Sequence, residues 1–456
     1  MAGMLTLDEL RDAVARGEID TVVAAQVDMQ GRLMGKRFHA EHFVEHGWRE
    51  THSCNYLLAT DIEMATVPGF LSTSWAQGYG DYTMRPDLAT LRRLPWLPGT
   101  ALVLCDVFDH HGEEEVAHAP RTILKKQLAR LEAAGMKAFM ASELEFFLFR
   151  ESYEEAQARG FRKLTPISAY NEDYNIFQTT KEEEVMRAIR NGLNAAGIPV
   201  ECSKGEASAG QEEINVRYAD ALTMADRHAV MKTACKEIAW AKGHAISFMA
   251  KWHDDAAGNS SHIHQSLWSA DGATPLFHDP QAEHGMSAMM RHYLAGLLHH
   301  ADALTLFLAP YVNSYKRFQA GTFAPTKAIW SLDNRTAGYR VCGAGSRAVR
   351  IECRVGGADL NPYLAFATQI AAGLDGIEKA LPLEAPYSGD AYGDQGLREI
   401  PHTLRDAIAA ADRSEMLRKA LGDRVMDHYL HAARWEQAEY DRRVTDWEIA
   451  RFFERA

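Results

Sequence analysis

The feature that most constrains this chain is a repeated alternation of charged and apolar side chains with a period of two residues. It occurs in four segments, each long enough for a β-strand: residues 138–149, 205–218, 260–268 and 347–355. Successive side chains of a strand point to opposite faces, so residues two apart share a face. We therefore expect four strands, each with one apolar face and one charged face.

The charged faces carry related chemistry. They present Glu143 and Glu145; then Glu206 before a Gly-Gln turn, followed by Glu213, Asn215 and Arg217; then His262, His264 and Ser266; and finally Arg350, Glu352 and Arg354. Taken singly, each segment is most simply an amphipathic antiparallel strand with one wet face. Two carboxylates on the same face, however, repel each other unless a positive group lies between them.

The four faces together indicate a more specific chemistry. Carboxylates with an imidazole form the ligand set of Mg²⁺ or Mn²⁺. Arginines supply the bidentate, permanently charged donors that a polyphosphate needs. The combination favours metal-assisted phosphoryl transfer. The sequence has no Gly-x-x-x-x-Gly-Lys-Ser/Thr motif, so it is not a P-loop enzyme.

The order of elements predicts two domains. Residues 22–38 read as a β-hairpin and residues 101–108 as a buried strand, which assigns residues 1–109 to a small β-rich domain. A charged connector follows at residues 110–118. Pro120 then begins a helix that ends at Gly135, and strands alternate with helices through a larger domain, residues 115–456.

Composition excludes several classes of protein. The net charge of −13 makes a nucleic-acid backbone an unsuitable partner. The six cysteines are scattered, which fits a reducing cytoplasm and argues against a disulfide framework or a zinc knuckle. The first residues lack the apolar core of a signal peptide, and no apolar run is long enough to cross a bilayer. We expect a cytoplasmic protein without a membrane partner.

Several motifs, in this order along the chain, give it a resemblance to glutamine synthetase of the bacterial type I group. They are SELEFF at 142–147, Glu206 with AGQEEI at 209–214, GNSSHIH at 258–264, NSYKR at 313–317, Asn334-Arg335, and RIECR at 350–354 followed by NPYL at 361–364. The resemblance implies an α+β fold, with an N-terminal β-grasp domain and a C-terminal catalytic domain. In that domain an antiparallel sheet, surrounded by helices, forms a funnel-shaped active site.

The resemblance also implies cofactors and ligands. ATP is the co-substrate, and about two or three Mg²⁺ or Mn²⁺ ions bind in each site. One ion would be held by Glu145, Glu206 and Glu213, and the other by Glu143, His262 and Glu352. The subunits would form a homo-oligomer, a dodecamer of two hexameric rings, with active sites between subunits.

Substrate contacts follow from the same resemblance. Arg335 and Arg340 would face the ATP phosphates as catalytic residues, and Arg347, Arg350 and Ser266 would lie near the nucleotide. L-Glutamate would be bound by Gly258, His264, Arg317 and Arg354. Glu206 would border the amine pocket as a possible base. No metal ligand of the family is missing, which makes a non-catalytic structural or regulatory relative improbable.

The chain departs from the family on the amine side. Where glutamine-forming members carry a flap glutamate that binds and deprotonates ammonium, this chain has Phe323. A phenyl ring accepts no proton but offers apolar surface or a face to an alkylammonium. Asp61 and Glu63 occupy roughly the place of the family's amine-pocket loop. The family's proline-rich regulatory loop with its modifiable tyrosine is not evident.

The sequence therefore predicts a ligase that phosphorylates the γ-carboxylate of glutamate and joins it to an organic amine, as in enzymes of amine catabolism. An ordinary glutamine synthetase with a variant flap, using ammonium, is the main alternative. A phosphotransferase that uses the same cluster on another acceptor is a further one.

Overall fold

The computed structural model describes residues 3–456. Its N-terminal part contains a five-stranded sheet in the order β2-β1-β5-β4-β3. The antiparallel pair β1–β2 is the predicted hairpin, and β1 runs parallel to β5 on its other side. This mixed sheet fits the expected β-grasp domain. Its strands are β1 (Thr21–Val27), β2 (Leu33–His39), β3 (Thr51–Cys54), β4 (Asp81–Arg93) and β5 (Thr100–Phe108).

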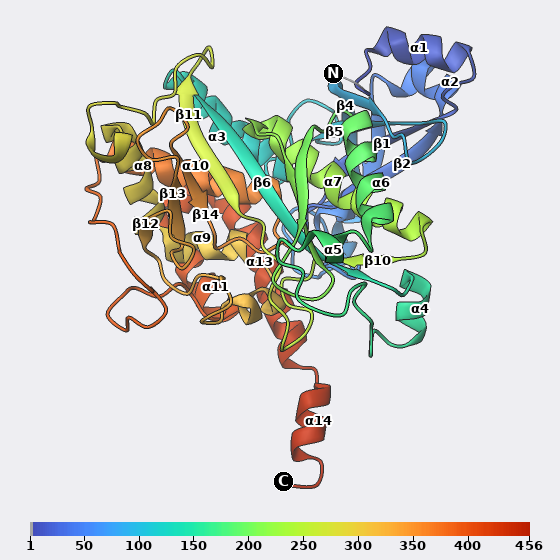
Figure 1. Cartoon of the computed structure of the whole chain (residues 1–456). Coiled ribbons are helices and arrows are strands. Elements are labelled where there is room, and N and C mark those ends of the chain that lie inside the picture. The colour runs from blue at the N-terminus through green and yellow to red at the C-terminus, as the bar shows by residue number, and fades with distance from the viewer. Residues whose placement is uncertain (1–2) are drawn as a thin grey trace.

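The second sheet runs in the order β12-β13-β14-β11-β6-β8-β7, with β9 and β10 paired to β6. All of its pairs are antiparallel except β12–β13. The long strand β6 lies beside β11 across its centre (Figure 1). The strands are β6 (Met136–Phe149), β7 (Val200–Gly205), β8 (Gln211–Val216), β9 (Ala219–Asp220), β10 (Ala245–Ser247), β11 (Ile263–Ser269), β12 (Trp330–Leu332), β13 (Tyr339–Cys342) and β14 (Arg350–Cys353).

Helices occur in both parts of the fold. They are α1 (Leu7–Ala15), α2 (Ala40–His42), α3 (Pro120–Ala133), α4 (Tyr153–Ala158), α5 (Ile176–Thr179), α6 (Glu183–Ala195), α7 (Ala221–Ala241), α8 (Ala288–His299), α9 (Ala301–Leu308), α10 (Pro362–Glu378), α11 (Leu404–Asp412), α12 (Glu415–Leu421), α13 (Asp423–Asp441) and α14 (Asp446–Phe452). Nearly every residue of α10 is buried, so this helix forms the centre of the core.

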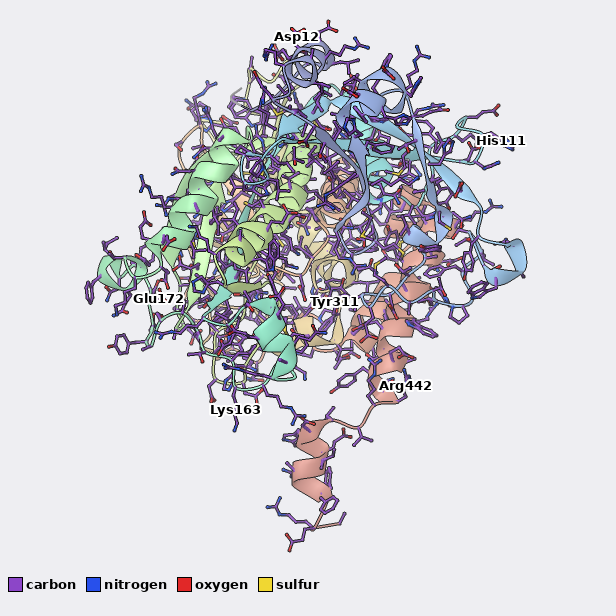
Figure 2. The ribbon with its side chains drawn as sticks, turned by 90° about the vertical axis from the view of Figure 1, so that its right-hand side faces the viewer. Asp12, His111, Lys163, Glu172, Tyr311 and Arg442 are labelled. Atoms are coloured by element: carbon purple, nitrogen blue, oxygen red, sulfur yellow. The ribbon has the colours of Figure 1, made fainter. Side chains whose placement is uncertain are left out.

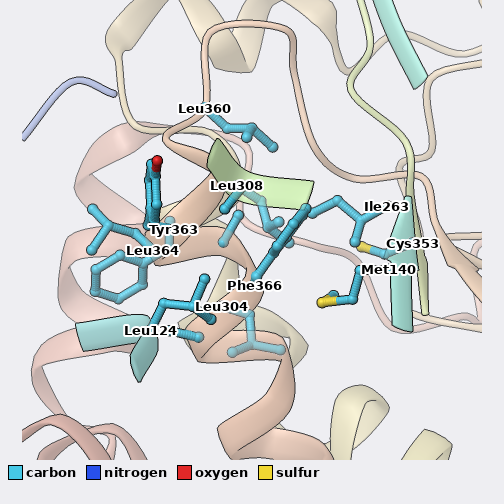
Figure 3. Close-up of a cluster of buried hydrophobic side chains, with 14 of the residues drawn as sticks. Leu124, Met140, Ile263, Leu304, Leu308, Cys353, Leu360, Tyr363, Leu364 and Phe366 are labelled. Carbon is cyan, nitrogen blue, oxygen red and sulfur yellow. The ribbon is translucent and has the colours of Figure 1, made fainter. Parts of the chain in front are cut away.

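The core joins the sheet to these helices. Met140, Ile263 and Cys353 extend from three neighbouring strands towards Phe366 of α10 (Figure 3). These strand residues are the apolar members of the alternating pattern, and all are 1% exposed or less. Burying them fixes the register of the strands, because a one-residue slip would move the charged side chains into the core. The core thus determines which face carries the polar residues.

The last helix leaves the body of the molecule. Arg442 follows the end of α13, and beyond it α14 projects away from the domain (Figures 1 and 2). In residues 3–456, no helix combines the length and apolar character that a bilayer crossing demands.

The expected fold class is confirmed, with two differences of detail. Residues 205–218 are not one strand, because β7 and β8 are separate strands joined by a loop that carries Glu206. The fourth charged segment is strand only over β14, since Gly343 and Gly345, both with positive φ, turn the chain before it. The domain boundaries at 109 and 115 remain a prediction.

Candidate active site

A cavity of about 740 Å³ opens on the charged face of the second sheet. Its wall combines carboxylates, arginines and one imidazole from strands that are distant in sequence. Of the predicted site residues it contains Glu143, Glu145, Glu206, Glu213, Gly258, His262, Phe323, Arg335, Arg340, Glu352 and Arg354. The structure therefore brings all six predicted metal ligands to one cavity.

Strand register explains this convergence. In the pairing of β6 with β8, Glu145 lies opposite Glu213. On the other side of β6, the backbone N–H groups of Glu143 and Glu145 donate to the carbonyls of His262 and Ser260. Glu352 of β14 pairs with His264 of β11. The alternation seen in the sequence and these registers together direct the polar side chains to one place.

The first part of the cluster is built around His262. Its Nδ1 lies 2.9 Å from Glu143 Oε2 and 3.6 Å from Glu352 Oε1. Its Nε2 is buried and has no hydrogen-bond partner. One ligand atom from each of His262, Glu143 and Glu352 can be chosen so that all lie within 4.8 Å of one another. Three donors and an orphaned imidazole nitrogen suit a divalent cation.

The second part comprises Glu145 and Glu213, whose oxygens also lie within 4.8 Å of a His262 nitrogen. Glu145 is fixed by the Ser260 N–H at 2.6 Å and by the Gln211 side-chain amide at 3.3 Å. Glu206 lies in the same cavity, where its carboxylate contacts the Lys204 ammonium. The same ammonium is 3.6 Å from Glu213.

The electrostatics of the cluster reflect crowded negative charge. Burial, together with the carboxylates of Glu143 and Glu145, raises the pKa of Glu213 to about 7. Burial also opposes ionisation of Glu143, but hydrogen bonds from His262 and His264 bring its pKa well below the ordinary value. Burial and the Arg354 charge lower the pKa of His262, so its imidazole is neutral and able to bind a metal. A cation between these groups would offset the repulsion.

Arginines flank Glu352 on both sides. Arg340 Nη1 donates to Glu352 Oε2 at 2.8 Å, and Arg354 Nη1 to Glu352 Oε1 at 2.5 Å. Burial raises the pKa of Glu352, yet the neighbouring His262 side chain and the Arg354 guanidinium outweigh this effect and hold its pKa at about 2. Arg335 lies in the same wall, and its carbonyl accepts from Arg354 Nε. Guanidinium groups beside a carboxylate cluster can neutralise a transferred phosphoryl group.

Arg317, for which the resemblance implies a contact with glutamate, does not line this cavity. It is 1% exposed, and its guanidinium donates to the carbonyls of Arg354 and Val355 and to Ser260 Oγ. In this structure it supports the cavity wall from behind. Gly258 permits this packing, because a Cβ there would lie 2.4 Å from Arg317 Cγ.

A second cavity of about 590 Å³ adjoins the first and shares Glu143 with it. It contains four of the residues predicted for ATP and glutamate: His264, Ser266, Arg347 and Arg350. His264 links the two spaces, since its Nε2 is 2.8 Å from Glu143 and its Nδ1 accepts from Arg350 at 3.2 Å. Aromatic side chains, Phe139, Tyr218 and Trp268, line the rest and suit a nucleotide base.

Phe323, predicted for the amine pocket, lines the first cavity and is 55% exposed. Asp61 and Glu63 do not reach this cavity within the same chain. Asp61 accepts from the indole of Trp435 at 3.4 Å, and Glu63 lies 3.7 Å from Arg443. Both residues therefore lie near helix α13 and the residues that follow it.

Sequence reasoning missed two residues that line the first cavity, Lys204 and Tyr174. A signal for Lys204 was present, because it precedes Glu206 by two residues at the end of a strand. Nothing in the sequence pattern indicated Tyr174, which belongs to a loop and has a left-handed backbone with φ 55°. Gln211, which holds Glu145, was read only as part of a motif.

Carboxylates, a neutral imidazole and arginines around one cavity are typical of metal-assisted phosphoryl transfer. Comparison with known proteins identifies the family. The model of the family "Glutamine synthetase, catalytic domain" matches residues 117–452. The chain belongs to the glutamine synthetase family.

Relatives match almost the whole chain. The gamma-glutamylethanolamide synthetase GlnA4 of Streptomyces coelicolor is 49% identical over 99% of this chain and 96% of its own length. The glutamate–isopropylamine ligase of a Pseudomonas species is 34% identical over 98% of this chain and 97% of its own. A solved structure, a GmaS/ADP complex, is 28% identical with a TM-score of 0.85 and covers 97% of this chain and 99% of that one.

Proposed function

We propose that this chain is an ATP-dependent ligase that forms γ-glutamyl amides from L-glutamate and an organic amine. The observation that carries this proposal is one cavity that combines the complete carboxylate–histidine–arginine cluster with Phe323 at its amine end. Relatives named for ethanolamine and isopropylamine support the same conclusion.

Mg²⁺ or Mn²⁺, about two or three ions in each site, fits the donor set described above. Glu145, Glu206 and Glu213 would hold one ion, and Glu143, His262 and Glu352 another. When bound, the ions supply charge neutralisation for the phosphates of ATP. Removing them with a chelator should abolish ATP binding as well as turnover.

The residues of the chain then have distinct roles. Arg335 and Arg340 neutralise the transferred phosphoryl group, while Arg347, Arg350 and Ser266 bind the nucleotide in the second cavity. Gly258, His264 and Arg354 hold glutamate, and Arg317 fixes the wall that positions it. An oxygen of the glutamate γ-carboxylate attacks the γ-phosphorus of ATP, the bond to the ADP oxygen breaks, and γ-glutamyl phosphate and ADP form.

The amine completes the reaction. Its nitrogen attacks the acyl carbon, the C–O bond to phosphate breaks, and inorganic phosphate leaves as the γ-glutamyl amide forms. Glu206, at the amine end of the cavity, accepts the proton that the amine loses. Phe323 provides apolar surface for the carbon part of the acceptor, and ammonium has no such part. Because a relative is named for ethanolamine, ethanolamine is the first acceptor to test.

The assembly follows the family. A dodecamer of two hexameric rings agrees with the placement of Asp61 and Glu63, which lie away from the cavity of their own chain. A neighbouring subunit could bring them to it. Sedimentation of an active monomer would contradict this assembly. The cytoplasmic location rests on the scattered cysteines of the sequence.

The test is amine-dependent phosphate release with ATP, Mg²⁺ and glutamate, with products identified by mass. The panel contains ammonium, methylamine, isopropylamine, ethanolamine and putrescine. Faster turnover with an organic amine than with ammonium supports the proposal. Preference for ammonium would make the chain an ordinary glutamine synthetase, and absence of ATP and Mn²⁺ binding would make it a non-catalytic relative.

A further inference from the structure

Lys204 places a fixed positive charge at the amine end of the cavity. It lies on β7, and its side chain is 21% exposed. The ammonium contacts the Glu206 carboxylate, lies 3.6 Å from Glu213, and stands 4.9 Å from the centre of the Tyr174 ring. Two carboxylates and an aromatic face form a cage for a cation, and a side chain of the protein already occupies it.

The carboxylates that contact Lys204 are also proposed to bind metal. Glu206 and Glu213 are also proposed ligands of a divalent ion, together with Glu145. Once they hold a divalent ion, the three carboxylates keep one net negative charge, and Lys204 balances it. Asp173 is the other carboxylate at this end of the cavity, and it is exposed to solvent, which screens its charge. In the loaded enzyme the three carboxylates, the ion and Lys204 therefore leave no excess negative charge that could bind a second ammonium.

The cavity walls beside the Lys204 ammonium are aromatic. Tyr174 and Phe323 both line the cavity, and their side chains are 67% and 55% exposed. An acceptor that extends outwards from the reacting nitrogen passes between these residues and near Lys204. Aromatic walls accept an alkyl chain or a hydroxyl group, whereas a second ammonium there would meet a like charge.

We propose that Lys204 is a specificity-determining residue that restricts the acceptor to amines with a single positive charge and a neutral tail. This inference rests on the proposed ligase function. Two unit charges about 5 Å apart near a protein surface repel each other strongly enough to reduce turnover by roughly tenfold or more. Polyamines should therefore be poor acceptors, and ethanolamine or short alkylamines good ones.

The experiment compares butylamine with putrescine, which have the same carbon chain and differ by one terminal ammonium. With the full-length enzyme, ATP, Mg²⁺ and glutamate, the ratio of kcat/KM for butylamine to that for putrescine should be at least about tenfold. In Lys204→Met, which keeps the length without the charge, the ratio should fall towards one. Lys204→Arg should preserve it. Lys242→Met is the matched control, because Lys242 pairs with Glu184 outside this cavity.

Each outcome supports or overturns the proposed role of Lys204. An unchanged ratio in Lys204→Met overturns the inference while leaving the ligase function intact. If Lys204→Met does not fold or turn over, the wild-type ratio decides, and equal use of butylamine and putrescine overturns the inference. Failure of the wild type to use any organic amine, with ammonium accepted, would instead refute the proposed function.

Discussion

Replacing Phe323 with glutamate should restore the use of ammonium. Phe323 has a left-handed backbone, φ 56°, and its carbonyl accepts from Arg354 Nη2 at 3.3 Å. Neither feature depends on the side chain, because phenylalanine and glutamate tolerate this backbone about equally. Phe323→Glu therefore changes the chemistry at the amine end while leaving the loop in place.

The expected gain in the use of ammonium depends on how exposed the site is to solvent. A carboxylate about 4 Å from an ammonium gains about 4 kcal/mol near a protein surface and about 1 kcal/mol in bulk water. Because Phe323 is 55% exposed, the gain should lie towards the lower value. We expect about 1.5 kcal/mol, or roughly a tenfold rise in kcat/KM for ammonium. Loss of the half-exposed ring should cost larger amines about 1 kcal/mol, or roughly fivefold.

The assay is phosphate release with ammonium and with isopropylamine, measured for wild type, Phe323→Glu and Phe323→Leu. The leucine variant loses the ring without adding charge, so it should weaken the use of isopropylamine and leave ammonium unchanged. If Phe323→Glu gains nothing with ammonium, or if both variants gain equally, the argument from charge is refuted.

Three further predictions concern the supporting structure. Burial and the neighbouring Glu172 and Glu212 raise the pKa of Glu182 to about 11. Between pH 4.5 and about 11 the unfolded state therefore binds fewer protons than the folded state, and the free energy of unfolding falls as pH rises. Glu182→Gln should therefore be more stable than wild type at pH 9 by about 1–3 kcal/mol, and the two proteins should be much closer in stability at pH 5. If urea unfolding gives the same difference in midpoint between the two proteins at both pH values, the prediction is wrong. His262→Ala should weaken Mn²⁺ binding, measured by calorimetry, by at least about tenfold, and equal affinity would remove His262 from the ligand set. Gly258→Ala should raise the KM for glutamate by about tenfold, because the new Cβ would lie 2.4 Å from Arg317 Cγ, whereas the control Gly393→Ala meets no atom within 4 Å. An unchanged KM in Gly258→Ala would show that Arg317 does not position glutamate.

The metal side of the site could be predicted from sequence because strand alternation is a local rule. Glu143 and Glu145 alternate with buried Leu144 and Phe146, so burial of one pair directs the other into the cavity. Register could not be predicted in the same way, since the pairing of Glu145 with Glu213 joins strands through long loops. The family resemblance supplied that information.

Other features depend on tertiary contacts that leave no local pattern. Arg317 was expected to contact glutamate, but its two Nη groups donate to two carbonyls and Ser260 in the wall. Asp61 and Glu63 were expected at the amine pocket, and within the chain they lie beside α13 and the residues that follow it. In each case the side chain alone permits either role, and only the surrounding fold decides between them.

The two ends of the cavity also differ in how they are built, and this difference should allow them to change independently. The ligand cluster lies on or directly beside paired strands, where a shift of one residue would misplace the buried core as well as the ligands. Tyr174 and Phe323 lie in loops, both with left-handed backbones, φ 55° and 56°. Such residues change at little cost to the core, because loops carry few buried contacts. Phosphoryl-transfer chemistry can therefore stay constant while substitutions in these loops, and at Lys204 on the rim of the sheet, change which amine is accepted.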